Sequence, residues 1–112
     1  MIPKRLSRVG ETVRAEISEM ILRDLKDPRI GLVTITDVLM SPDLRQAKVF
    51  FSRIGTKEES EESLVGLTKA AGFIRRELGR RLRLKFAPEL RFLHDDSLET
   101  GARISDLLRD IE

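Results

Sequence analysis

Residues 31–54, GLVTITDVLMSPDLRQAKVFFSRI, decide the fold of this 112-residue chain. The first part, Gly31 to Met40, is rich in β-branched residues and predicts a strand. The turn sequence Ser41-Pro42-Asp43 follows it. Gln46 to Ile54 then alternates apolar with polar side chains and predicts a second strand. Because the link between the two strands is so short, we expect an antiparallel hairpin.

Helical patterns flank this hairpin on both sides. Before it, apolar residues recur every three or four positions from Lys4 to Lys26, which predicts an amphipathic helix that Asp27-Pro28 ends. After it, Thr56 is expected to cap a second helical stretch that runs to about Arg83. Within that stretch, Ala70-Ala71-Gly72 predicts either a tolerated glycine or a bend where two short helices meet.

The last part of the chain predicts a third strand and a final helix. Glu89 to His94 places Leu90 and Phe92 on one strand face, and Asp96 or Ser97 is expected to cap a short C-terminal helix. The element order is therefore α-β-β-α-kink-α-β-α. It predicts one α+β domain over residues 1–112, with helices on one face of a three-stranded sheet. Since the third strand follows a helical crossover, we expect it to join the hairpin as a parallel edge strand.

Composition excludes several classes of function. The chain has no cysteine and one histidine, which excludes disulfides, thiolate catalysis and any metal site made of several cysteines or histidines. No phosphate-loop or dinucleotide-binding motif occurs, and no apolar run approaches the roughly 20 residues that span a bilayer. For His94 a structural role, and for Asp95-Asp96 a helix-capping role, is favoured over catalysis or metal binding. We therefore expect a soluble, cytoplasmic protein that is not an enzyme, with no cofactor, metal, membrane or small-molecule substrate.

The charge is strongly segregated along the sequence. The net charge of +2 hides a run from Lys69 to Arg91 that contains eight cations and two acids. An acidic cluster precedes this run at residues 58–62, and a second acidic region follows it from His94 onward. Segregation of this kind is typical of a surface that binds a polyanion.

The basic run predicts an arginine face on the second helical stretch. Ile74, Leu78 and Leu82 share one side of a helical wheel, whereas Arg76 and Arg80, with Arg83 after them, share the opposite side. Arginine suits phosphate groups and exposed bases, so we predict an RNA-binding site here. Its candidate residues are Arg75, Arg76, Arg80, Arg81, Arg83 and Lys85, extended by Lys4, Arg5 and Arg8 at the start of the first helix.

Aromatic residues that could stack on bases are scarce. Phe50, Phe51, Phe86 and Phe92 are expected in the core, and Phe73 is the single aromatic considered as an RNA contact. This scarcity favours recognition of phosphates and RNA shape over the reading of single strands. Two alternatives remain at this point: a module that binds partner proteins, and a DNA-binding domain, which lacks any helix-turn-helix spacing.

In these respects the chain resembles the ribosome-binding factor A family. The likeness is carried in order by Asp27-Pro28-Arg29-Ile30-Gly31, Ser41-Pro42-Asp43, Ala47-Lys48-Val49, Ala70-Ala71-Gly72-Phe73-Ile74-Arg75, Pro88-Glu89-Leu90-Arg91-Phe92, Asp95-Asp96-Ser97 and Gly101-Ala102-Arg103-Ile104.

The resemblance implies a type II KH-like fold in which the kink Ala70-Ala71-Gly72 replaces the GXXG loop of RNA-binding KH domains. It also implies an assembly factor without enzymatic activity, and the small sheet with its helical cover suggests a monomer. Such a factor binds the free small (30S) ribosomal subunit, promotes late maturation and 5′-end processing of 16S rRNA, and is associated with growth in the cold.

Overall fold

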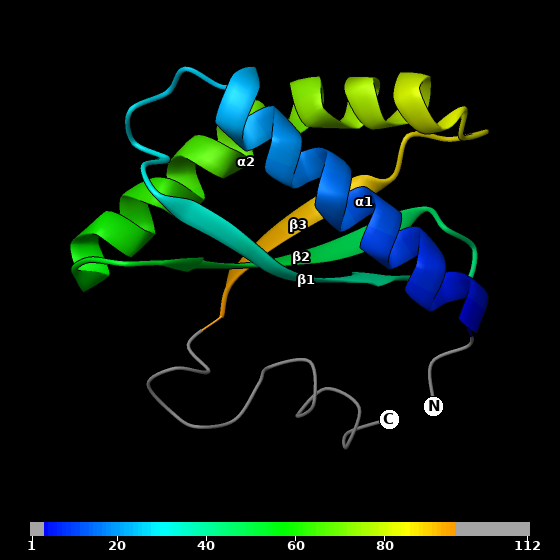
Figure 1. The fold of residues 1–112 in the computed structure, drawn as a ribbon, viewed down its shortest axis with the longest axis horizontal. Coiled ribbons are helices and arrows are strands. Elements are labelled where there is room, and N and C mark those ends of the chain that lie inside the picture. The colour runs from blue at the N-terminus through cyan, green and yellow to red at the C-terminus, as the bar shows by residue number, and fades with distance from the viewer. Residues whose placement is uncertain (1–3, 96–112) are drawn as a thin grey trace.

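Two helices cover one face of a three-stranded sheet in the computed structural model, which describes residues 4–95 (Figure 1). The elements are α1 (Lys4–Arg23), β1 (Val33–Met40), β2 (Gln46–Arg53), α2 (Lys57–Leu82) and β3 (Glu89–His94). The predicted C-terminal helix, which Asp96 or Ser97 was expected to cap, lies outside the described residues. Within residues 4–95, neither helix combines the length and the apolar character that a membrane crossing needs.

The sheet has the topology that the sequence predicts. β1 and β2 form an antiparallel hairpin, in which the register shifts between Ile35 and Asp37. β3 pairs with β2 in parallel, so that Val49 of β2 lies beside Val38 on one side and Phe92 on the other. The strand order β1-β2-β3 therefore places the third strand at the edge of the hairpin.

The core lies between the sheet and the helices. Val13, Ile17 and Met20 of α1 and Leu67, Ile74 and Leu78 of α2 pack with the inward-facing residues Ile35, Val38, Ala47, Val49, Phe51 and Phe92. α1 packs mainly on β1, and α2 packs mainly on β3. This apolar burial is the main favourable contribution to folding, and it fixes which side of each helix faces solvent.

The first helix and the first strand are each shorter than predicted. α1 ends at Arg23 because the amide of Leu25 donates to Met20 O, five residues back, so the helical turn widens there. Asp27 then accepts hydrogen bonds from the backbone and guanidinium of Arg29, which forms a turn. β1 begins only at Val33 because Gly31 has a φ of 64°, a left-handed conformation that a strand does not accommodate.

The second helix begins as predicted. Thr56 is the N-cap: its hydroxyl accepts from the amide of Glu59 at 3.1 Å, and the Glu59 carboxylate accepts from the amide of Thr56 at 2.9 Å. These two bonds satisfy two amide groups that would otherwise lack partners at a helix start. The hydrogen bonds from Thr56 lower the pKa of Glu59, which is therefore ionised in the first turn, where a negative charge is favourable.

The kink sequence does not interrupt the second helix. α2 is one helix from Lys57 to Leu82, and Ala70-Ala71-Gly72 lies inside it. Figure 1 shows its axis changing direction part-way along, where green gives way to yellow-green. The prediction of two separate short helices is therefore replaced by one bent helix. It ends at Leu82 because Arg83 has a φ of 51° and caps it in a left-handed conformation, so Arg83 does not continue the helical face as predicted.

Candidate nucleic-acid interface

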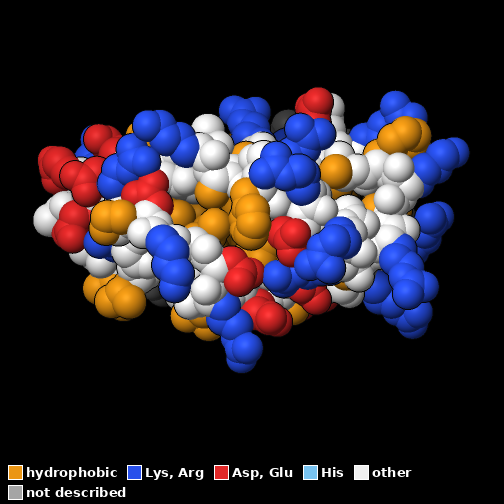
Figure 2. All heavy atoms as spheres, turned by 90° about the horizontal axis from the view of Figure 1, so that it is seen from above, with side chains coloured by type: hydrophobic (Ala, Val, Ile, Leu, Met, Phe, Trp, Pro, Cys, Tyr) orange, Lys and Arg blue, Asp and Glu red, His pale blue; other side chains and the backbone are white. Residues whose placement is uncertain are grey.

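Lysine and arginine side chains gather at one end of the molecule. Figure 2 shows them at the end where Figure 1 places the start of α1 and the C-terminal end of α2, while the start of α2 lies at the opposite end and is acidic. The exposed cations that these elements and the loop after α2 contribute are Lys4, Arg5, Arg8, Arg76, Arg80, Arg83 and Lys85. We call this set the basic end. The fold thus brings two segments far apart in sequence to one surface.

Arg76 and Arg80 lie on the exposed side of α2, opposite the fully buried Ile74 and Leu78. The Arg80 side chain is 70% exposed and forms an ion pair with Glu77 at 2.8 Å. The hydrogen bond from Arg80 lowers the pKa of Glu77, which is ionised at neutral pH. Because exposed ion pairs contribute little to stability, Arg80 can exchange its carboxylate partner for a phosphate at little cost.

Arg75 has a structural partner. Its Nε donates to Pro88 O at 3.0 Å, and a terminal nitrogen donates to Ala87 O at 3.3 Å. The side chain therefore fastens the loop before β3 to α2. The sequence placed Arg75 beside the apolar stripe, and from that position its side chain reaches the neighbouring loop rather than widening the basic surface.

Arg81 links the two helices. Its guanidinium contacts Glu16 at 3.2 Å and Asp24 at 3.0 Å on and just after α1, and Glu77 at 3.2 Å on α2. Only 22% of the side chain is exposed. These acids raise the pKa of Arg81, with the hydrogen bond to Glu16 the largest cause. The expectation that Arg81 faces RNA thus differs from its observed position within an interhelical network.

Within Ala70-Ala71-Gly72, no close contact requires a glycine at position 72. Gly72 is exposed, and a Cβ atom placed there would lie near one other atom, Nη1 of Arg76, at 3.8 Å. That is an ordinary van der Waals distance. Phe73, the aromatic that the sequence singled out, is 36% exposed. It adds a partly accessible ring beside the arginine side of α2.

Phe86 does not lie in the core, contrary to the prediction. It is 47% exposed in the loop between α2 and β3. Cζ of Arg45 lies 4.3 Å from the centroid of its ring, and Nζ of Lys85 lies 5.5 Å from it. Arg45 was not a candidate in the sequence, because its position beside Phe86 depends on the β1–β2 turn and the α2–β3 loop meeting in space.

His94 and Asp95 each contact a residue of another strand. The His94 ring lies 5.5 Å from the Phe51 ring, centroid to centroid. Asp95 is buried, and its carboxylate accepts a hydrogen bond from the Thr36 hydroxyl at 2.7 Å. Within residues 4–95, no three acidic or histidine side chains are grouped in a way that would hold a metal ion. Asp96 lies outside the described residues.

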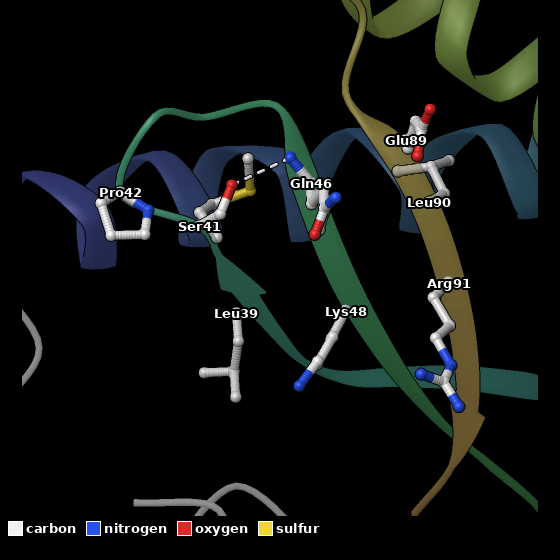
Figure 3. A pocket seen from close by; sticks show the side chains of 10 residues that line it. Leu39, Ser41, Pro42, Gln46, Lys48, Glu89, Leu90 and Arg91 are labelled. Atoms are coloured by element: carbon white, nitrogen blue, oxygen red, sulfur yellow. Dashed lines mark hydrogen bonds between the residues drawn. The ribbon is translucent and has the colours of Figure 1, made fainter. Parts of the chain in front are cut away.

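A hollow of about 640 Å³ lies where the β1–β2 turn meets the start of β3 (Figure 3). Lys48 and Arg91 are register partners on adjacent strands, and Figure 3 shows them pointing the same way, beside Leu39. At its upper rim, the amide of Gln46 donates to the Ser41 hydroxyl at 3.0 Å. Alternation in the sequence predicts that Lys48 faces outward. The sequence did not predict that Arg91 lies beside it, because this depends on the register in which β3 pairs with β2.

Comparison with known proteins agrees with this arrangement. Residues 5–108 match the family described as ribosome-binding factor A. A protein of that name from Halothermothrix orenii is 50% identical over 97% of this chain and 89% of its own. The crystal structure of ribosome-binding factor A from Thermus thermophilus superposes with a TM-score of 0.71 at 27% identity, covering 80% of this chain and 94% of that one.

A second comparison concerns a ribosomal complex. A homology model of Thermus thermophilus ribosome-binding factor A, fitted into the cryo-EM map of its complex with 30S, matches with a TM-score of 0.62 at 28% identity. The match covers 75% of this chain and 88% of that one. These likenesses confirm the predicted α+β class and the KH-like arrangement of helices on a three-stranded sheet.

Proposed function

The chain belongs to the ribosome-binding factor A family, and we propose that it binds the free small (30S) ribosomal subunit and promotes late maturation and 5′-end processing of 16S rRNA. The Thermus relative in a 30S complex supports the choice of the small subunit. In this proposal the protein acts as a monomer in the cytoplasm, and it acts by binding rather than by catalysis.

The basic end is the observation that carries this proposal. Its exposed cations come from the start of α1, the C-terminal part of α2 and the loop after it, so they present a surface rather than a single line of charge. Arg76 and Arg80 project from a helix whose other side is buried in the core, which fixes the spacing between their Cα atoms. Planar guanidinium groups bind phosphate oxygens in pairs, and such contacts position a protein on RNA without reading its sequence.

Binding of this kind accounts for a role in assembly. A protein that neutralises phosphates on two neighbouring rRNA segments stabilises the conformation in which those segments lie close together. It would thereby hold an immature rRNA conformation, or block a competing one, until later steps release it. If about five phosphates are neutralised, the logarithm of the affinity falls against the logarithm of the salt concentration with a slope of about −3 to −4.

Co-sedimentation with purified small and large subunits at two salt concentrations tests the proposal. We expect salt-sensitive binding to the small subunit and little to the large one. Arg76→Glu should weaken that binding about tenfold or more, because a charge-assisted contact worth about 1.5–3 kcal/mol becomes a repulsion. Lys57→Glu is the matched control, since Lys57 is an exposed cation at the start of α2, away from the basic end.

The co-sedimentation results can contradict the proposal in two ways. Equal binding to both subunits, or to neither, would overturn the proposed function. Undiminished binding of Arg76→Glu would show that the arginine side of α2 is not the RNA site and would favour a protein partner. Processing is tested separately: cells depleted of the protein should accumulate 16S rRNA precursors with unprocessed 5′ ends, more strongly at low temperature. Normal 5′ ends under depletion would contradict the processing role.

A further inference from the structure

Phe86 is the most exposed phenylalanine of the described chain, ahead of Phe73 at 36%. Phe50, Phe51 and Phe92 are at most 5% exposed, whereas nearly half of Phe86 is accessible to solvent. A phenylalanine that is nearly half accessible to solvent forgoes about half of the stabilisation that full burial of its side chain yields. Its ring is therefore an accessible aromatic surface within an otherwise strongly cationic neighbourhood.

The ring is held in place from one side by Arg45. The Arg45 guanidinium carbon lies 4.3 Å from the ring centroid, within the range of a cation–π contact. The backbone of Arg45 is itself fixed: its amide donates to Asp43 at 3.1 Å, and its carbonyl oxygen accepts from the amide of Glu89 at 2.8 Å. The arginine that contacts the ring therefore lies in a turn whose backbone is fixed by hydrogen bonds.

A second cation lies close to the same ring. The Lys85 ammonium is 5.5 Å from the ring centroid. Arg83, exposed at the helix cap, is two residues before Lys85 in the sequence. Other large apolar side chains that are exposed, such as Leu22 and Ile54, are aliphatic and offer no aromatic face. An aromatic face beside two cations matches the two chemical parts of a nucleotide, a flat base and a phosphate.

We propose that Phe86 and Arg45 form a stacking site for an unpaired nucleobase, with Lys85 and Arg83 binding the adjoining phosphates. The inference rests on the proposed function and adds a component to it: the basic end holds not only the phosphates of structured RNA but also one unstacked nucleotide of a loop, bulge or single strand. Unstacked bases bind preferentially to aromatic rings and guanidinium planes, because both offer a flat and polarisable surface.

A tryptophan reporter tests the site directly, because the natural chain contains no tryptophan or tyrosine. Phe86→Trp places the sole indole at the proposed site. We expect its fluorescence to be quenched by a short oligoadenylate, and quenched far less by a strand of equal length and charge in which the bases are absent. Ile54→Trp is the matched control, since Ile54 is 86% exposed at the end of β2; its fluorescence should respond to neither strand.

Affinity provides the second measurement. Base stacking on an aromatic side chain is worth about 1–3 kcal/mol, so Phe86→Ala should weaken oligoadenylate binding about 5- to 150-fold. The slope of affinity against salt should stay the same, because no charge is removed. Circular dichroism of the Phe86→Ala variant confirms that it remains folded before binding is compared.

The results separate this inference from the proposed function. If the natural protein binds small subunits but Phe86→Ala binds oligoadenylate equally well, the stacking site is overturned and the assembly role stands. Equal quenching of the reporter by base-free and adenine-containing strands would also overturn it, because the ring would then sense only the approach of phosphates. If the natural protein fails to bind small subunits, the proposed function fails whatever the reporter shows.

Discussion

Replacing Gly10 with alanine is expected to lower the free energy of unfolding. Gly10 is buried on the side of α1 that packs against β1. A Cβ atom built there lies 2.6 Å from the carbonyl oxygen of Val38. Because this oxygen belongs to the backbone of the sheet, it cannot rotate away as the end of a flexible side chain would. The helix must move outward, which loosens the packing of Val13 and Ile17 below it.

Two opposing contributions set the magnitude. Alanine is favoured over glycine inside a helix by about 1 kcal/mol. Inserting a methyl group into a closely packed site costs about 1–3 kcal/mol, and a clash with rigid backbone belongs at the upper end of that range. We therefore expect Gly10→Ala to lower the free energy of unfolding by about 2 kcal/mol.

Gly72→Ala is the matched control on the second helix. A Cβ atom at this exposed position has one neighbour, an arginine nitrogen at 3.8 Å, so the helix-propensity gain is not opposed by a clash. We expect this variant to be about 0.5–1 kcal/mol more stable than the natural protein. Urea unfolding followed by far-ultraviolet circular dichroism measures both, as shifts of the midpoint at constant slope.

The two substitutions together make the reasoning refutable. If Gly10→Ala unfolds at the same or a higher urea concentration than the natural protein, α1 does not lie as close to the sheet as described. If Gly72→Ala is destabilised, the bend of α2 depends on glycine and not only on packing. A stable Gly72→Ala variant that no longer binds small subunits would assign the bend a direct role in binding.

Three further predictions concern charged residues. Arg53→Met should lower the free energy of unfolding by about 2–4 kcal/mol, because the buried guanidinium donates hydrogen bonds to a backbone oxygen and a serine that would lose their partner; urea unfolding measures this. Arg81→Gln should lower the free energy of unfolding and leave subunit binding nearly unchanged. Arg76→Gln should weaken subunit binding and leave the free energy of unfolding nearly unchanged. The opposite pattern in unfolding and co-sedimentation would contradict the proposed division of the two arginines into structural and binding roles. The hydrogen bond from Arg29 lowers the pKa of Asp27 to about 2, so this carboxylate stabilises the fold above its unfolded pKa of about 4, and the contribution is lost as the pH falls toward 2. In Asp27→Asn, the free energy of unfolding measured between pH 5 and 2 should therefore depend less on pH. An unchanged dependence would refute this.

The arginines of α2 occupy two kinds of position on a single helix. Arg76 and Arg80 occupy positions opposite the buried stripe and remain accessible. Arg75 and Arg81 flank the stripe, where neighbouring elements come within reach of a long side chain. On this helix the accessible arginines lie far from the packed side, because the positions beside that side meet partners within the protein.

The sequence by itself determined the elements and their pairing. The hairpin, the third strand at its parallel edge and the cap of α2 at Thr56 follow from local signals: β-branched runs, short turns and a threonine before a helical stretch. The side of each helix that is buried also follows from apolar spacing, because burial requires that spacing. The same periodicity identified Arg76 and Arg80 as exposed.

Only the tertiary structure decided which of the cations beside the packed side of α2 have partners within the protein. The acids that hold Arg81 come from α1, and the carbonyl groups that hold Arg75 come from the loop before β3. The exposure of Phe86 and its contact with Arg45 depend on two loops meeting in space. Helical and strand periods are properties of neighbouring residues and can be seen in one segment. A side chain's partners belong to segments distant in sequence, and only packing brings them together.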